Sequence, residues 1–170
     1  APYKKVDLIV EAFSEMTNKK LIVIGDGPEL KKIKSIATPN ISVLGYQEFE
    51  ILKSYMQRAK AFIFVAEEDF GIIPIEAQAC GTPVIAYGKG GSLETVKGKF
   101  INETINDSDT GVFMRVQTKE EIINTVDYFE KHQGVFNSNK IREFSLSFDV
   151  KIFKSKIKKS FTKVIEKYSK

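Results

Sequence analysis

The chain has 170 residues, of which 42% are hydrophobic, 11% aromatic and 28% charged. These fractions lie near globular averages and exclude a disordered chain, a coiled coil and a disulfide-based scaffold. No run of 18 apolar residues occurs and the N-terminus has no apolar signal region, so we expect a cytoplasmic protein without a membrane span. The length fits one domain or half of a larger enzyme, and the start without Met is expected of a piece of a longer chain.

The net charge of +4 is distributed unevenly along the chain. Residues 149–170 hold eight lysines against two acids, a net charge of +6, which leaves about −2 for residues 1–148. The arginines are Arg58, Arg115 and Arg142 alone. Because bidentate arginine contacts are the usual means of reading phosphates and base edges, this supply disfavours a nucleic-acid partner.

Single copies of cysteine and histidine exclude further classes of site. Cys80 is the only cysteine, so no internal disulfide can form and a reducing compartment is expected. We interpret it as a structural thiol, since no histidine is near it in the sequence. His132 is the only histidine and follows a polar helix, where a solvated or capping role is expected. Metal sites built from His and Cys are therefore disfavoured, and we expect no metal and no cofactor.

Short apolar runs alternate with helical patterns along the chain. The expected helices cover residues 6–16, 29–37 (with Pro28 suited to its start), 48–58, 74–79, 92 onward, 119–131 and 137–144. The expected strands cover residues 21–24, 41–44, 61–65, 83–87 and 111–116, the last at a sheet edge, whereas the polar residues 98–111 read as a loop. This alternation predicts an α/β fold with a parallel, doubly wound, Rossmann-like sheet, in which ligands bind beyond the carboxyl ends of the strands.

The loop after the third expected strand carries the strongest chemical signal. Gly71 lacks a Cβ, so backbone amides there can approach a ligand closely. Pro74 opens the next expected helix, whose free N–H groups would receive a phosphate or a polyhydroxylated ligand. Glu76 is expected in the first helical turn and Glu68 at the strand end, so both could face one crevice. Local chemistry leaves open that both glutamates are ordinary capping or solvated residues.

Two further glycine loops are ambiguous. The loop 88–91 lacks the third glycine of a dinucleotide fingerprint and the acidic residue that should follow about 20 positions later. It is either an anion-accepting loop or a tight turn, with Ser92 as the expected N-cap. Residues 25–28 read as a turn rather than as a site of their own.

Residues 68–86 resemble the signature of family 4 retaining glycosyltransferases of the GT-B fold, including the E-x7-E spacing of Glu68 and Glu76. The run reads Glu68-x-Phe70-Gly71-x-x-Pro74-x-Glu76-Ala77-x-Ala79-x-Gly81-x-Pro83-Val84-Ile85-Ala86. Other landmarks of that family appear in the same order, namely Lys4-x-Val6-Asp7, Val23-x-Gly25-x-Gly27-Pro28, Leu44-Gly45 and Gly90-Gly91-x-x-Glu94. The resemblance extends from Pro2 to about Gly111 and more loosely to Tyr168.

Such enzymes have two Rossmann-like domains, and the resemblance is to the C-terminal half, which binds the nucleotide-sugar donor. It implies that residues 1–148 form this donor-binding domain. Glu76 would bond the ribose hydroxyls and Glu68 the hydroxyls of the donor sugar. The implied donor site also contains the amides of Phe70, Gly71 and Ile72, the glycines Gly25 and Gly27, and backbone contacts from residues 41–45 to the base.

The resemblance also implies the catalytic roles. Lys4 matches the lysine that neutralises the diphosphate, so that the nucleoside diphosphate leaves without a metal, with Glu68 beside the sugar. The arginine that pairs with this lysine, and the acceptor-binding N-terminal domain, would lie before Ala1. We therefore expect this chain to bind donor weakly and not to transfer sugar alone.

The particular residues in two of these motifs indicate which donor to expect. Glu68-Asp-Phe-Gly-Ile72, with Tyr3-Lys4, resembles mannosyltransferases of cell-surface polysaccharide synthesis, so GDP-mannose is the expected donor and a UDP-sugar the alternative. The acceptor would be a glycan or a lipid-linked sugar. Two other functions stay open: a non-catalytic nucleotide- or sugar-binding module, and an NAD-binding Rossmann domain, which the incomplete glycine fingerprint disfavours.

Residues 149–170 form the last predicted unit, an amphipathic helix with a lysine-rich polar face. It is expected to lie on this domain or on the missing N-terminal domain. The alternative is peripheral contact with an anionic membrane surface.

Overall fold

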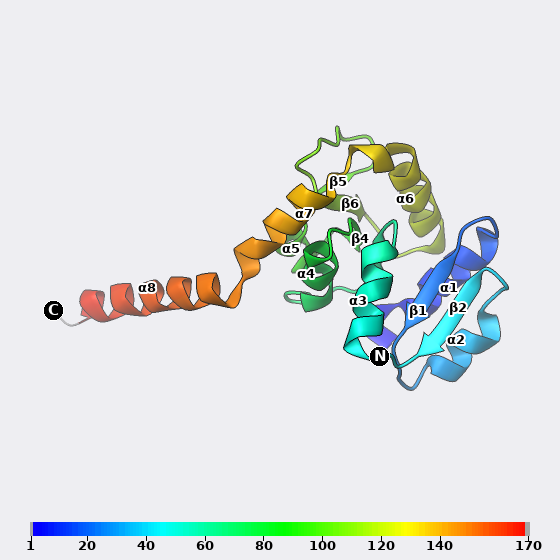
Figure 1. Ribbon diagram of the computed structural model, residues 1–170, viewed down its shortest axis with the longest axis horizontal. Coiled ribbons are helices and arrows are strands. Elements are labelled where there is room, and N and C mark those ends of the chain that lie inside the picture. The colour runs from blue at the N-terminus through cyan, green and yellow to red at the C-terminus, as the bar shows by residue number, and fades with distance from the viewer. Residues whose placement is uncertain (1, 169–170) are drawn as a thin grey trace.

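Short strands alternate with helices along residues 2–168, the part of the chain that the computed structural model describes, with side-chain surroundings through residue 165 (Figure 1). The strands are β1 (Leu21–Ile24), β2 (Ile41–Gly45), β3 (Phe62–Phe64), β4 (Val84–Tyr87), β5 (Gly98–Phe100) and β6 (Gly111–Met114). The helices are α1 (Val6–Glu15), α2 (Leu30–Ile36), α3 (Phe49–Arg58), α4 (Ile72–Ala79), α5 (Ser92–Thr95), α6 (Lys119–His132), α7 (Ser138–Ser145) and α8 (Val150–Tyr168), with 3-10 turns η1 (Pro2–Lys4), η2 (Gln133–Val135) and η3 (Leu146–Phe148). No helix in this part has the length and apolar composition that crossing a bilayer requires.

All strand pairs of the described residues are parallel, which confirms the predicted α/β fold. The hydrogen bonds form two sheets, β1-β2 and β3-β4-β6-β5, where the sequence predicts one. The sequence predicts a loop where β5 lies, because the stretch is polar, and this expectation is wrong: β5 pairs with β6. As a result β6 lies between β4 and β5 rather than at the edge, and a Cβ on Gly111 would lie 2.0 Å from the carbonyl oxygen of Val84.

The side chains of the central strands alternate between two apolar layers, as the two-residue period of a strand requires. One layer joins the strands to α1 and α6 and contains Ile63, Ile85, Val112, Met114, Val10, Ile122 and Phe129. The opposite layer joins them to α3 and α4 and contains Phe64, Val84, Ala86, Phe113, Met56 and Ala77. Leu21 and Val23 of β1 contact the first layer, so one core supports both sheets.

Charged contacts fasten α1 to the neighbouring helices. Lys19, which follows α1, pairs with Glu130 and lies 3.0 Å from Asp127, both on α6. The hydrogen bond with Glu130 raises the pKa of Lys19 above its ordinary value. At the other end of α1, Asp7 pairs with Lys32 of α2 at 2.6 Å, and this bond lowers the pKa of the Asp7 carboxyl.

Three local predictions can be compared with the structure. Pro28 does not begin a helix: Leu30 N donates to Gly27 O at 3.1 Å, so residues 27–30 form a turn and α2 starts at Leu30. Cys80 is half-buried and desolvation raises the pKa of its thiol, in agreement with a structural role. His132 ends α6 with Nδ1 2.8 Å from the carbonyl oxygen of Tyr128, as a capping role requires.

Helix α8 extends away from the rest of the molecule (Figure 1). Its described side chains, from Val150 to Ile165, are all exposed. Asp149 begins the helix by accepting a hydrogen bond from Lys151 N at 2.7 Å. Asp149 is also the first residue of the second unit predicted from the sequence, and the division into units 1–148 and 149–170 stays a prediction.

Asn40 joins the end of α1 to the start of β2. Its Nδ2 lies 2.9 Å from Phe13 O, 3.2 Å from Met16 O and 2.8 Å from Lys19 O. Its Oδ1 accepts a 2.6 Å bond from Thr38. One amide thus joins three carbonyls at and beyond the end of α1 to the start of β2, two of which, Phe13 O and Met16 O, also accept backbone hydrogen bonds.

We expect Asn40→Asp to lower the free energy of unfolding by about 2 kcal/mol, because a carboxylate cannot donate to these carbonyls and repels them. Chemical denaturation at neutral pH measures this change. The matched change Asn102→Asp, at an exposed position, should cost less than about 0.5 kcal/mol. Equal stability of both variants would contradict the role given to Asn40.

Candidate functional site

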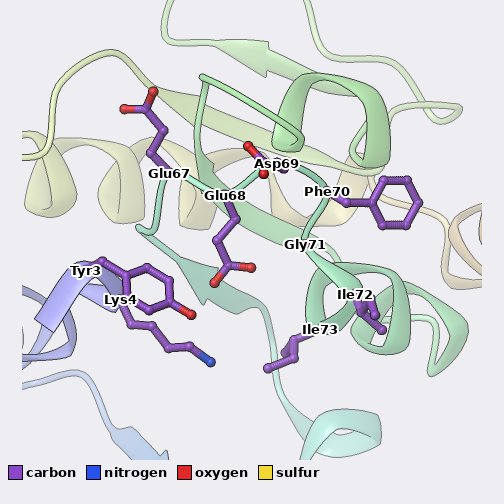
Figure 2. A pocket seen from close by; sticks show the side chains of 9 residues that line it. All are labelled: Tyr3, Lys4, Glu67, Glu68, Asp69, Phe70, Gly71, Ile72 and Ile73. Atoms are coloured by element: carbon purple, nitrogen blue, oxygen red, sulfur yellow. The ribbon is translucent and has the colours of Figure 1, made fainter. Parts of the chain in front are cut away.

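An open hollow of about 620 Å³ lies between the loop after β3 and the N-terminal turn (Figure 2). Two segments more than 60 residues apart in the sequence meet there. Its lining residues are Tyr3, Lys4, Glu67, Glu68, Asp69, Phe70, Gly71, Ile72 and Ile73. This is the end of a parallel strand at which ligands bind in such folds.

The loop owes its shape to contacts at both of its ends. On the β3 side, Gln117 Nε2 donates to Val65 O at 2.6 Å. On the α4 side, Gly71 is the N-cap in a left-handed conformation with φ 77°, which glycine adopts without the strain of a Cβ. The first helical residues, Ile72 and Ile73, present N–H groups without intrahelical partners.

Helix α4 starts two residues earlier than predicted, at Ile72 instead of Pro74. Proline is compatible with this third helical position, because its missing N–H would have had no acceptor there. Glu76 consequently lies in the second helical turn, and the first turn contains no acidic residue. The expectation that Glu76 occupies the first turn is wrong.

The opposite wall of the hollow is the N-terminal turn η1. It closes with Lys5 N donating to Pro2 O at 3.0 Å, and Lys5 takes a left-handed conformation with φ 54° before α1 begins. This turn places Lys4 beside the loop (Figure 2). Asp7, which follows it, is held by Lys32 outside the hollow.

Figure 2 shows how the side chains lie. The carboxylate of Glu68 and the ammonium of Lys4 both point into the space between the two segments, with the hydroxyl of Tyr3 near them. The ring of Phe70 points away from that space. Glu67 also points away, and its carboxylate pairs with Lys89 at 3.1 Å, which raises the pKa of Lys89.

Five of the residues singled out from the sequence therefore line one hollow: Lys4, Glu68, Phe70, Gly71 and Ile72. Glu76, Gly25 and Gly27 do not line it. Glu76 is exposed on α4, while Gly25 and Gly27 lie in the turn after β1, where Gly25 N donates to Gly45 O at 2.8 Å.

The remaining lining residues, Tyr3, Glu67, Asp69 and Ile73, were missed. Each is a direct sequence neighbour of a residue that was singled out. Adjacency to Lys4, Glu68 and Ile72 was the signal that could have found them.

The glycine loop after β4 supports the loop after β3. Gly91 N donates to Glu68 O at 2.7 Å, and a Cβ on Gly91 would lie 2.4 Å from Phe70 Cα. Gly90, with φ 62°, is equally close, since its Cβ would lie 2.7 Å from Glu68 O. The amide of Gly91 is thus engaged within the protein, which favours the tight-turn interpretation of this loop.

The expected N-cap role of Ser92 is wrong. Gly91 caps α5 and Ser92 is its first helical residue, with a buried hydroxyl that makes no hydrogen bond within the described part of the chain. Helix α5 has only four residues and starts at Ser92, so the N-cap lies one position earlier than expected.

The lining groups suit an anionic, hydroxyl-rich ligand. The ammonium of Lys4 and the free N–H groups at the start of α4 favour negative charge, and the carboxylate of Glu68 can accept hydrogen bonds from hydroxyls. Among residues 2–168, no group of three or more His, Cys, Asp or Glu side chains is arranged to hold a metal ion.

Known proteins of one family resemble this chain. The family model described as glycosyl transferases group 1 matches residues 1–145. An uncharacterized glycosyltransferase of Methanocaldococcus jannaschii is 31% identical over 156 residues, which cover 86% of this chain and 41% of that protein. The GDP-mannose-dependent monoacylated alpha-(1-6)-phosphatidylinositol monomannoside mannosyltransferase of Corynebacterium glutamicum is 31% identical over 110 residues, which cover 56% of this chain and 29% of that protein. This chain spans less than half the length of these relatives.

Solved structures of GT-B glycosyltransferases share the fold. Anabaena HepE, in a crystal structure with UDP and glucose, matches with a TM-score of 0.74 and 19% identity over 95% of this chain and 45% of that one. Sucrose-phosphate synthase from Thermosynechococcus elongatus matches with a TM-score of 0.75 and 21% identity over 98% of this chain and 43% of that one.

We expect Gly91→Ala to reduce the free energy of unfolding by about 1–3 kcal/mol, because the added methyl group must displace the backbone at Phe70. Hydrogen exchange should become faster in residues 67–72, and thermal unfolding reports the loss of stability. Gly134→Ala is the matched control, since a Cβ there meets no atom within 4 Å. Exchange in the loop that matches the control would show that Gly91 does not support it.

Proposed function

The chain belongs to the glycosyl transferases group 1 family, and we propose that it is the half of such an enzyme that binds a nucleotide-sugar donor. The observation that carries this proposal is the shared hollow of Lys4, Glu68 and the start of α4. The ammonium of Lys4 faces the carboxylate of Glu68 across it, and the free amides at the start of α4 lie on the same wall as Glu68, which suits a diphosphate joined to a sugar.

Each residue has a role in the proposed complex. Lys4 and the amides near Gly71 and Ile72 neutralise the diphosphate, and Glu68 accepts hydrogen bonds from sugar hydroxyls. Glu76, exposed on the next turn of α4, bonds the ribose hydroxyls beyond the hollow. A pair of vicinal hydroxyls on one carboxylate gives two charge-assisted bonds, which makes this contact a strong one.

In the proposed reaction, the bond between the anomeric carbon and the diphosphate oxygen breaks, and the nucleoside diphosphate leaves. The oxygen of an acceptor hydroxyl forms the new glycosidic bond, with the anomeric configuration retained, and its proton is released. Fixed positive charge from Lys4 and α4 stabilises the leaving diphosphate, so the reaction needs no metal. We propose that the acceptor, a glycan or a lipid-linked sugar, is held by a second domain that accounts for the greater length of the relatives.

We propose mannose as the transferred hexose and GDP-mannose as the donor. The name of the Corynebacterium relative supports this choice. HepE was crystallised with UDP and glucose, which keeps a UDP-sugar as the alternative. A binding module that has lost transfer is the second candidate, and it would bind the same donors without turnover.

Helix α8 supports a further part of the proposal, peripheral contact with an anionic membrane surface on the cytoplasmic side. Its described side chains include six lysines and no acid between residues 150 and 165. Phe153, Ile157, Phe161 and Val164 recur at three- and four-residue steps and are all exposed. Such a stripe beside lysines is typical of helices that lie in the headgroup region.

Titration calorimetry tests the donor assignment. We expect this chain to bind GDP-mannose, to bind UDP-glucose less tightly and not to bind NAD, with the same affinity when a metal chelator is present. Glu76→Ala should weaken GDP-mannose binding about 10- to 100-fold, since it removes charge-assisted bonds worth roughly 1.5–3 kcal/mol.

Glu143→Ala, at an exposed position on α7, is the matched control and should leave the affinity unchanged. Near-normal donor affinity of Glu76→Ala would remove the ribose assignment. Binding of NAD in preference to both nucleotide sugars would overturn the proposed function.

Cosedimentation with vesicles tests the membrane contact. We expect binding to vesicles that contain phosphatidylglycerol at low salt, and loss of binding at high salt, because screening weakens the attraction of each lysine. Replacing Lys158 and Lys159 with Glu should abolish binding, whereas the same change of charge at Lys31 and Lys34 of α2 should not. Binding that resists salt would contradict docking by charge, and no binding at all would favour a position of α8 on the second domain.

A further inference from the structure

The ring of Phe70 leaves the hollow and enters an aromatic chain. It meets the ring of Phe148 edge to face, with centroids 6.0 Å apart and an interplanar angle of 75°. Phe148 in turn meets Phe144 at 5.6 Å and 76°. The chain of rings thus leads from the loop after β3 through η3 to the last turn of α7.

The Phe148 end of this contact is fixed by its own turn. Asp149 N donates to Leu146 O at 3.1 Å, and Ser147 Oγ donates to Phe144 O at 2.7 Å. These bonds close η3 on the end of α7, and α7 lies along α4. Phe148 is therefore part of a fixed frame rather than of the loop.

Phe70, the other partner of this ring contact, lies in the less constrained segment. Phe70 is 45% exposed and precedes Gly71, whose backbone is the most permissive in the loop. The backbone of Phe70 lies directly against Gly91, but glycine has no side chain that could pack on the Phe70 ring. The ring of Phe148 is the aromatic partner against which the Phe70 side chain lies.

We propose that Phe148 is a positioning residue for the donor sugar: its ring holds the Phe70 side chain, and with it the backbone of Phe70, so that the Phe70 amide is oriented toward the sugar before the ligand arrives. This inference rests on the proposed donor site. Binding then avoids part of the entropy cost of ordering the loop. The effect concerns the sugar end of the donor, because the proposed diphosphate amides and the proposed ribose contact, Glu76, belong to α4 and its N-cap Gly71.

The test separates the sugar from the nucleotide. In calorimetry with GDP-mannose and with GDP, we expect Phe148→Ala to weaken GDP-mannose about 3- to 10-fold, the value of an edge-to-face ring pair, and GDP by less than about twofold. UDP-glucose and UDP form a second pair of probes. Phe148→Tyr keeps the ring and should restore the ratio. Phe161→Ala, which removes an exposed ring from α8, is the matched control and should change neither affinity.

Hydrogen exchange gives a readout that needs no ligand. Phe148→Ala should accelerate exchange in residues 69–72 while the strands of the core keep their protection. If Phe148→Ala fails to fold, Phe148→Leu and Phe70→Leu, alone and combined, replace it, and a positioning role predicts that their effects on the GDP-mannose to GDP affinity ratio are not additive.

Equal weakening of GDP-mannose and GDP, or additive effects of the two leucine variants, would overturn the positioning role. A parent chain that binds none of these nucleotides would instead overturn the proposed function. Exchange in residues 69–72 would still decide whether Phe148 holds the loop.

Discussion

The close approach of Gly91 to the backbone of Glu68 and Phe70 is the contact on which the site depends. No side chain fits between the two loops, and the 2.7 Å bond from Gly91 N to Glu68 O joins them directly. This contact sets where the carbonyl of Glu68 lies, and the start of α4 follows from there through Gly71. The loop that lines the hollow is therefore shaped by backbone contact with a second loop, while the carboxylate of Glu68 points into the hollow.

The core explains why this loop can be both exposed and well placed. Strands β3, β4 and β6 send alternate side chains into two apolar layers, so their carboxyl ends are held from both faces. Lys4 reaches the same place by a different route, through α1, which packs in one of these layers. A hollow between the β3 loop and η1 is thus the meeting point of two elements anchored in one core, as in the ligand sites of other open α/β sheets.

Because the chain belongs to the glycosyl transferases group 1 family, these contacts can be related to what a transferase requires. A transferase must hold a flexible, charged donor without water competing for its hydroxyls, and preorganised amides and fixed charges do this at low entropic cost. Helix α8 adds a surface with another chemistry, basic and apolar, at the far side of η3. Phe148 lies two residues before that helix and its ring contacts Phe70 in the loop after β3, so the two features meet at one residue.

The sequence by itself determined the parallel α/β fold, strands β1 to β4 and five lining residues of the hollow, because apolar periodicity and motif spacing are local properties. Local patterns also missed β5, placed β6 at the sheet edge and put the starts of α2 and α4 at the wrong residues. Tertiary structure alone decided these, along with the support from Gly91 and Phe148. Phe70 and Phe148 are 78 residues apart, and no periodicity in the sequence links them. Their contact exists because α7 packs along α4, and only the folded core brings those helices together.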